Sequence, residues 1–283
     1  MLKRKAVLFL LAVTFFTVSD VYGTGGRVVV LDVGMGQSIL LERDGHGFLI
    51  DTGLARYAPH VLSRLKYHGV KDLDYLLLSH LHPDHAGGSA QIRDAWPRTT
   101  VLWNCFEPQQ LHPEEEQFQK KTHALLSGDS SQRCLSAGDS LSWQGYVIRV
   151  LWPVIDAGKS LNHNSHVLLL TTPQGRSMLV MGDVGKSVER RLMHDIRGLL
   201  SPSGLSLFVA SHHGSAFGTD PDFLSIVRPD ISIVSVEKNN RFGYPSDTSL
   251  ATLETYSESV VRTDRDGELC YRLDSVVVEA CSD

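Results

Sequence analysis

Short runs of apolar residues recur along most of the chain, separated by polar segments that contain glycine or proline. Runs of three to six residues rich in valine, isoleucine and leucine are typical of β-strands buried in a sheet. They predict strands at 28–33, 38–41, 48–50, 75–78, 100–103, 146–151, 166–171, 178–181, 207–209 and 231–234. Two alternating stretches near the C-terminus, 268–273 and 276–280, predict a terminal hairpin.

Other segments repeat their apolar residues every three to four positions, which is the period of an α-helix. They predict helices at 60–68, 89–96, 114–126, 186–196, 222–227 and 248–256. The first strands follow one another almost without helices, and strands and helices alternate afterwards. This order favours a mixed α/β layering over a purely parallel, doubly wound sheet. No stretch has the composition of a linker, so we expect one large domain.

The first 23 residues have the layout of a signal peptide, with a basic start, an apolar run at 6–18 and small residues before Gly23. We expect cleavage after Gly23, which leaves 24–283 as the folded domain. The apolar run of 13 residues is shorter than the ~17–25 residues of a membrane-spanning helix. A permanent single-span anchor is the alternative. The expected location is the periplasm or the outside of the cell, with no stable membrane insertion after cleavage.

Composition narrows the class of protein further. Hydrophobic residues make up 42% of the 283 residues and charged residues 21%, which excludes disordered and fibrous classes. The net charge of −5 argues against a protein that a general positive field holds on nucleic acid. A local basic groove is still compatible with it.

The four cysteines, an even number, fit an oxidising compartment in which two disulfides form. Cys270 and Cys281 flank the predicted terminal hairpin, so we expect them to pair. By elimination Cys105 then pairs with Cys134. The alternative is four free buried thiols.

Polar residues follow the apolar runs directly. Asp51, 79–88, 182–183, 211–215 and 235–246 each come after a predicted strand. An open sheet places its site residues at such strand ends, so these segments are expected to converge on one edge.

Segment 79–88 holds three histidines and an aspartate within six residues. His80 and His82 are two positions apart and can point the same way from an extended segment, while Asp84 and His85 follow as the chain turns into a helix. The two pairs can therefore serve two adjacent metal ions. Mixed histidine and carboxylate ligation suits Zn, Mn or Fe. The alternative is a polar surface loop.

The motif HxHxDH followed by glycine resembles that of the metallo-beta-lactamase fold superfamily, and the chain looks most like a stand-alone ComEC/Rec2 hydrolase domain. Further motifs follow in the family's order at 32–38, 49–53, 162–165, 182–183, 211–215, 239–246 and 262–267. The resemblance implies an α/β fold, a four-layer αββα sandwich with a two-metal site on one edge.

The resemblance also implies a ligand set. His80 and His82 would hold the first metal, Asp84 and His85 the second, and Asp183 would bridge both. A carboxylate at the end of strand 178–181 is exposed at the edge of the sheet, which supports Asp183. The alternative for Asp183 is an N-cap of the helix from 186.

Four further side chains are candidates. Of His212 and His213 at most one is expected to bind metal; we prefer His212, so that His213 can donate to substrate. His163 lies in the segment from which many family members supply a third histidine, and faces either the site or solvent. Tyr244 replaces a histidine that is usual in ComEC-like chains, which puts the leaving-group proton donor in doubt, because a phenol of pKa ~10 is a weaker acid than imidazolium.

The reaction class implied is hydrolysis, because two ions ~3.5–4 Å apart lower the pKa of a shared water and give a hydroxide nucleophile near neutral pH. We expect Zn most of all, with Mn or Fe as alternatives, and Asp84, His213 and Tyr244 as catalytic candidates. Asp51 is expected either to orient a ligand histidine or to shape its own turn.

The expected function is an exported phosphodiesterase or DNA nuclease, connected with DNA uptake, that acts on an anionic substrate. The alternatives are hydrolysis of another ester or amide, such as a lactone, a phosphocholine ester or a β-lactam, and a non-catalytic module that binds DNA or a partner. Asn239, Asn240, Arg241 and Arg265 either position an anion or belong to loops. The insert at 107–126 either overhangs the site or is a solvated amphipathic helix.

Overall fold

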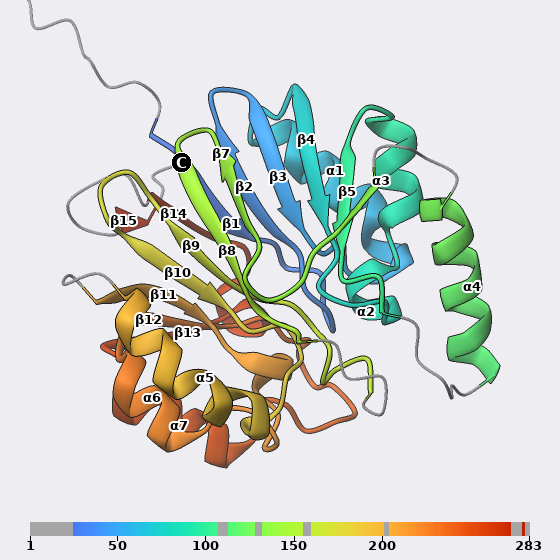
Figure 1. Cartoon of the computed structure of the whole chain (residues 1–283). Coiled ribbons are helices and arrows are strands. Elements are labelled where there is room, and N and C mark those ends of the chain that lie inside the picture. The colour runs from blue at the N-terminus through green and yellow to red at the C-terminus, as the bar shows by residue number, and fades with distance from the viewer. Residues whose placement is uncertain are drawn as a thin grey trace, which may run out of the picture.

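A computed structural model describes residues 25–106, 113–127, 132–154, 160–200, 204–272 and 279–280. Two β-sheets pack face to face, and helices cover the outer face of each sheet (Figure 1). The predicted four-layer α/β sandwich is therefore confirmed. The expected signal peptide at 1–23 lies outside the described residues. Within the part of the chain that the structure describes, no helix is both long and apolar enough to cross a membrane.

The first sheet has eight strands in the order β15-β14-β1-β2-β3-β4-β5-β6. Its strands from β15 to β3 pair antiparallel, and those from β3 to β6 pair parallel. Their bounds are β1 (Arg27–Val30), β2 (Ile39–Arg43), β3 (His46–Ile50), β4 (Asp72–Leu77), β5 (Thr100–Trp103), β6 (Gln132–Cys134), β14 (Leu269–Arg272) and β15 (Glu279–Ala280).

The second sheet has seven strands in the order β13-β12-β11-β10-β9-β8-β7. Strands β7 to β10 pair antiparallel, and β10 to β13 pair parallel. Their bounds are β7 (Ser140–Trp143), β8 (Tyr146–Trp152), β9 (Val167–Thr171), β10 (Ser177–Val180), β11 (Leu205–Val209), β12 (Pro229–Val234) and β13 (Ser259–Arg262). The ends of parallel strands lie at one edge of their sheet, and this edge holds the polar segments.

All six predicted helices form. On the first sheet lie α1 (Ala58–Tyr67), α3 (Ser89–Ala95) and α4 (Pro113–Ser127), and on the second α5 (Lys186–Leu199), α6 (Pro221–Val227) and α7 (Asp247–Tyr256). Four short helical turns were not predicted: η1 (Ala55–Tyr57), α2 (Pro83–Ala86), η2 (Ser211–Gly214) and α8 (Thr263–Asp266). The insert that was predicted at 107–126 contributes α4, which lies beside α3 at the outside of the molecule (Figure 1).

Three hydrophobic clusters hold the four layers together. One lies between the sheets and the other two lie between each sheet and its helices. In β1, Val28 and Val30 belong to the cluster between the sheets, whereas Val29 belongs to the cluster under α1 and α3. Because both faces of such strands are buried, their sequences are continuous apolar runs rather than alternating ones.

The differences from the predicted strands are small and have local causes. Strands β6, β7 and β13 were missed, since they are only three or four residues long and largely exposed or half-buried. The first predicted strand ends at Val30 rather than at 33. Beyond it the chain bends toward Gly34, whose φ of +64° favours glycine and where a Cβ would overlap the Tyr57 hydroxyl.

One predicted disulfide is confirmed and its companion is not tested. Cys105, just beyond β5, is bonded to Cys134 at the end of β6. Cys270 lies in β14, which forms the predicted hairpin with β15. The predicted partner of Cys270, Cys281, lies outside the described residues.

Glu189 is a buried carboxyl group on the inner face of α5. It accepts hydrogen bonds from the backbone N–H of Thr219 at 2.9 Å and of Asp220 at 2.5 Å, at the start of α6. Burial raises the pKa of Glu189 to about 7, although the two amides act in the opposite direction. The group therefore stays protonated in the folded protein at pH values where the unfolded chain has lost the proton.

Replacing Glu189 with glutamine should flatten the dependence of stability on pH. The wild type should lose about 3 kcal/mol of its free energy of unfolding as pH rises from about 4.5 to 7, since the folded state binds the extra proton there. Glu189→Gln should match the wild type near pH 5 and exceed it by about 1–3 kcal/mol at pH 8. Urea unfolding at several pH values measures both profiles. Parallel profiles for the two proteins would contradict the assignment, and Glu254→Gln, on the exposed face of α7, is the control.

Candidate metal centre

Polar side chains from both sheets meet at the edge where the parallel strands end. Asp51 follows β3, Ser79 follows β4 by two residues, and Asp183 and His213 come after β10 and β11. Asp51 and Ser79 are hydrogen-bonded to each other, and His85, six residues beyond Ser79, lies 3.1 Å from Asp183 in the second sheet. The predicted convergence on one edge is confirmed for these segments.

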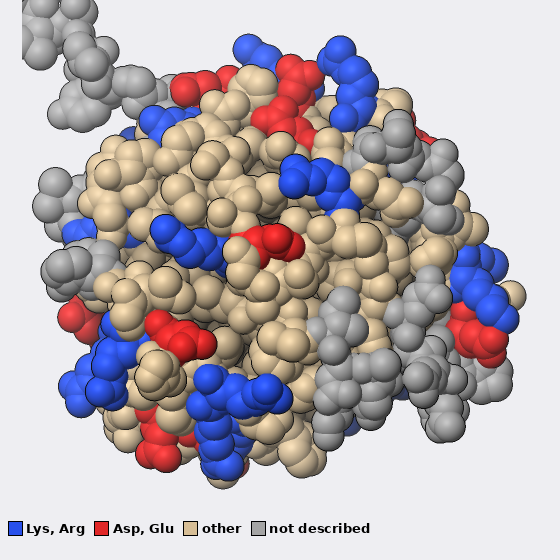
Figure 2. Space-filling model, in the orientation of Figure 1, with Lys and Arg blue, Asp and Glu red and all other residues tan. Residues whose placement is uncertain are grey.

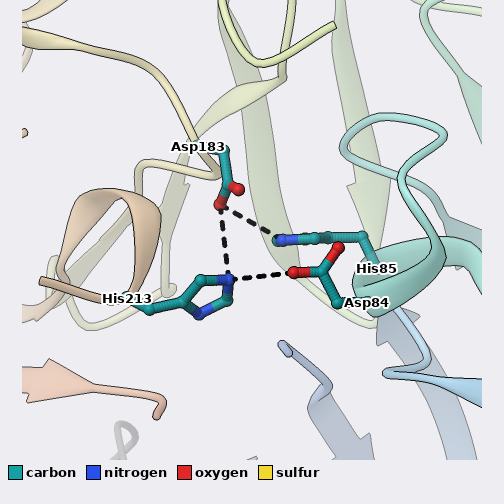
Figure 3. Close-up of side chains that lie close together, drawn as sticks. All are labelled: Asp84, His85, Asp183 and His213. Carbon is teal, nitrogen blue, oxygen red and sulfur yellow. Dashed lines mark ion pairs between the residues drawn. The ribbon is translucent and has the colours of Figure 1, made fainter. Parts of the chain in front are cut away.

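One group consists of Asp84, His85, Asp183 and His213 (Figure 3), whose candidate ligand atoms all lie within 4.8 Å of one another. His85 Nε2 is 3.1 Å from Asp183 Oδ1, and His213 Nε2 is 3.9 Å from the same oxygen. His213 Nε2 is also 3.5 Å from Asp84 Oδ2. Three of the four side chains are buried and Asp84 is half-buried, so the group can surround a single ion.

A second group consists of His80, His82 and Asp183. His80 Nε2 lies 2.9 Å from His82 Nδ1 and 3.8 Å from Asp183 Oδ2. Asp183 therefore belongs to both groups, with Oδ1 toward His85 and Oδ2 toward His80. A carboxylate shared in this way is the arrangement that a bridging ligand requires.

The backbone explains how one short segment serves both groups. His82 is the extended N-cap residue of α2, which begins at Pro83. His80 lies in the bend before this residue and His82 projects from extended chain, whereas Asp84 and His85 project from the helical turn of α2. Asp183 does not cap α5, because the N-cap residue is Gly185 and no side chain caps it.

The structure brings His213, rather than the His212 that we preferred from the sequence, into a donor group. Both residues have left-handed backbone, with φ of 49° and 56°. This turn places His213 in the interior at 4% exposure, within the first group, whereas the side chain of His212 is 25% exposed. His212 Nε2 lies 3.8 Å from Asp183 Oδ2 but is absent from both groups. His213 is therefore the better ligand candidate.

Each of the three buried histidines of the two donor groups has its Nδ1 atom next to an oxygen. His85 Nδ1 donates to Asp51 Oδ2 at 2.8 Å, and His213 Nδ1 donates to the Ser235 carbonyl at 2.9 Å. His80 Nδ1 lies 3.1 Å from both Ser79 Oγ and Ser165 Oγ. Protons held at Nδ1 leave the Nε2 atoms, which face the two groups, free to bind metal.

Asp51 is the centre of this support. Its Oδ1 accepts from the Ser79 N–H at 2.7 Å, and its Oδ2 accepts from Ser79 Oγ at 2.7 Å and Gln37 Nε2 at 2.8 Å, in addition to His85. The expectation that Asp51 orients a ligand histidine is confirmed as a contact. The role of Gln37 was not predicted from the sequence, although Gln37 lies within the motif at 32–38.

The segment at 162–165 contributes a serine rather than a histidine. Ser165 Oγ contacts His80 Nδ1 and accepts the Asp183 N–H at 3.1 Å. The ring of His163 instead lies edge-on to Trp152, with ring centroids 5.4 Å apart, and His163 is absent from both groups. Of the two alternatives for His163, the structure thus favours a position outside the metal centre.

Three candidates for anion positioning lie in the loop at 239–241, and the fourth, Arg265, lies on α8. Asn240 organises its own loop, because its Oδ1 accepts from the N–H of Phe242 and of Tyr244. Arg265 pairs with Asp266 on α8. Arg241 lies with its guanidinium 4.8 Å from the centre of the Phe242 ring. Asn239 has left-handed backbone in the turn before them.

Burial and neighbouring charges shift the pKa values of the side chains in the centre. Burial acts to raise the pKa of Asp183, but His85 and His213 hold it well below its usual range. Burial acts to lower the pKa of His85, but Asp183 and Asp51 hold it well above its usual range. Burial, together with the charges of His85 and His82, holds the pKa of His80 well below its usual range. A metal ion would compete with the proton of His85, so metal affinity should fall as pH falls.

The donor set fits divalent metal ions. Among the described residues, His85 Nε2 and His213 Nε2 are buried and make no hydrogen bond of good geometry, which is costly unless another group binds them. Imidazole nitrogen and carboxylate oxygen together suit Zn, Mn or Fe. His80, His82 and Asp183 would hold one ion, and Asp84, His85, Asp183 and His213 the other.

Comparison with known protein families identifies the family of this chain. The model of the metallo-beta-lactamase superfamily matches residues 31–237. The matched range includes every residue of both groups.

Two relatives are similar over most of this chain. Recombination protein 2 of Haemophilus influenzae is 27% identical over 248 residues, which are 86% of this chain and 28% of that protein. ComE operon protein 3 of Bacillus subtilis is 27% identical over 266 residues, 87% of this chain and 33% of that protein. The chain spans about a third of the length of these relatives.

A solved structure shares the fold. Igni18, a metallo hydrolase from the archaeon Ignicoccus hospitalis, superimposes with a TM-score of 0.54 over 86% of this chain and 98% of its own. Sequence identity is 13%, so the likeness concerns the fold alone.

Proposed function

The chain belongs to the metallo-beta-lactamase superfamily, and from that premise we propose that it is a two-metal phosphodiesterase that cleaves DNA. The observation that carries the proposal is the pair of donor groups that share Asp183. The relative named recombination protein 2 supports DNA as the substrate, since recombination is a reaction of DNA. The same two groups suit other esters and amides, so the substrate rests on this relative.

The residues of the chain have separable roles in this proposal. Bound metal ions would supply a nucleophilic water at neutral pH and would polarise the phosphoryl oxygen. Asp51, Ser235 and the serines beside His80 hold each imidazole in the tautomer that presents Nε2. In this proposal His212, which is partly exposed beside Asp183, would give a proton to the leaving oxygen. This replaces the donor roles that the sequence suggested for His213 and Tyr244.

The protein would recognise DNA through a small part of its surface rather than through its overall charge. On the face drawn in Figure 2, acidic and basic side chains are interspersed and much of the surface is neutral. With a net charge of −5, the protein has no general attraction for a polyanion. Binding therefore depends on the metal ions and on a few side chains at the opening of the site.

We also propose that the protein acts outside the cytoplasm. The disulfide between Cys105 and Cys134 supports an oxidising compartment, either the periplasm or the exterior. The signal-peptide pattern of the first 23 residues supports the same location.

Metal-dependent cleavage of DNA is the experiment that tests the function. The protein, stripped with a chelator and reloaded with Zn or Mn, should degrade DNA, whereas the stripped protein and Asp84→Ala should be at least about 100-fold slower. Metal content is measured on the same samples. No cleavage by wild-type protein that holds two ions would refute the nuclease proposal, and lactone, phosphocholine ester and β-lactam substrates would then be tried.

The choice between the neighbouring histidines has its own test. His213→Ala should lower the affinity for one of the two ions by about 10–100-fold or more, because it removes a donor atom. His212→Ala should retain both ions at wild-type affinity. Metal titration of the stripped proteins measures this difference. The opposite result would restore the assignment first made from the sequence.

A further inference from the structure

Three aromatic rings form a row that leads from the metal centre to the surface. His212 lies next to Asp183, and its ring is edge-on to Tyr244, with centroids 5.6 Å apart. Tyr244 stacks on Phe242 with centroids 5.6 Å apart and an angle of 23° between the rings. The outermost ring, Phe242, is 50% exposed. We call His212, Tyr244 and Phe242 the aromatic row.

The loop that carries the outer part of the row is held in place. Asn240 accepts from the N–H groups of Phe242 and Tyr244, and its Nδ2 donates to the carbonyls of Glu237 and Tyr244. The Glu237 carboxylate lies 3.5 Å from Arg56, which comes from the side of the first sheet. A ring exposed on such a loop can bind a ligand without a large loss of conformational entropy.

The charge beside the row selects the kind of ligand. The Arg241 guanidinium lies over Phe242 at 4.8 Å from the ring centre. The positive charge of Arg241 would repel a cationic ligand, such as a choline group. It would attract a ligand that carries a phosphate next to a flat ring of its own. A nucleotide has both parts, since its base can pack against the exposed part of the Phe242 ring while its phosphate contacts Arg241.

We propose that the aromatic row binds unpaired nucleobases of the DNA strand whose phosphodiester lies at the metal centre, an inference that rests on the proposed nuclease function. Bases in a duplex are already stacked on their neighbours and do not offer a free face. The protein should therefore prefer single-stranded to duplex DNA. Phe242 would be a specificity-determining residue.

Binding can be measured apart from cleavage. A fluorescent single-stranded oligonucleotide with phosphorothioate linkages, which resist hydrolysis, is titrated with metal-loaded protein, and anisotropy gives the Kd. Phe242→Ala should raise the Kd about tenfold, within the range found when one base loses its stacking partner. Abasic positions in the strand should weaken binding to the wild type by a similar factor, and should add little further loss in Phe242→Ala.

Tyr67→Ala is a matched control. Tyr67 is 63% exposed and has the Arg64 guanidinium 4.0 Å from its ring centre, but it ends α1 near the start of β4, at the other end of the strand from Ser79. This variant should bind the oligonucleotide like the wild type. Equal loss in both variants would overturn the proposal, as would equal affinity for duplex and single strand.

The outcomes separate the inference from the function it rests on. If the wild type cleaves ordinary DNA but Phe242→Ala binds the strand normally, the binding role of the aromatic row is refuted and the nuclease proposal stands. If the strand binds through Phe242 but no DNA is cleaved, the row is supported as a binding surface and the nuclease is refuted. Phe242-dependent binding to anionic lipid vesicles, without binding to the strand, would overturn the proposal in favour of a membrane surface.

Discussion

Replacing Asp183 with asparagine should reduce hydrolysis by at least about 1000-fold, because a single carboxylate faces both donor groups and metal-ion catalysis supplies several kcal/mol. Its two oxygens face His85 and His80, at 3.1 and 3.8 Å. Asparagine has the same shape, but its side chain offers one oxygen and no negative charge. Both donor groups would therefore lose the negative charge that Asp183 supplies. Metal content should fall together with the rate.

The control for this variant is Asp195→Asn, since Asp195 is exposed on α5 and pairs only with its neighbour His194 among the contacts described. It should retain the wild-type rate and metal content. The measurement combines steady-state hydrolysis with metal analysis of the purified proteins. If Asp183→Asn kept two ions and most of the rate, Asp183 would not be a shared ligand.

Replacing Asp51 with alanine should lower the free energy of unfolding by about 3–5 kcal/mol, because it leaves several buried donors without an acceptor. Asp51 is fully buried and accepts from Gln37, Ser79 and His85. Metal affinity should also fall about 10–100-fold, since His85 loses the group that holds its Nδ1 proton. Urea unfolding and metal titration measure the two effects.

Asp94→Ala on the exposed face of α3 is the matched change, with an expected effect on stability within about 0.5 kcal/mol. Asp51→Asn separates the two roles of Asp51. An amide can still accept from Ser79 but binds the His85 proton more weakly, so it should recover more of the stability than of the metal affinity. Equal recovery of both would argue that Asp51 only shapes its turn.

The strands and helices could be predicted because their sequence patterns are local, whereas the four-layer arrangement was expected from the family resemblance. Strands such as β1 are apolar on both faces, and helices such as α5 repeat their apolar residues with helical period, so each pattern marks an element and the face it buries. The strands that were missed, such as β6, are short and exposed and carry little of this signal. Strand β6 joins the sheet through backbone pairing with β5, which is distant in sequence.

The sequence by itself determined the four clustered ligand candidates His80, His82, Asp84 and His85, because one strand end and one helical turn suffice to bring them together. It also placed Asp183 at the end of a buried strand. Neighbours in sequence stay neighbours in space, whatever the rest of the chain does.

Only the tertiary structure decided between His212 and His213, and between Ser165 and His163 as the neighbour of His80. Two consecutive left-handed residues turn His213 inward, a backbone conformation that side-chain identity does not reveal. Ser165, just before β9 of the second sheet, reaches His80 across 85 residues of sequence. Such contacts depend on how the two sheets pack, and packing is a property of the whole chain.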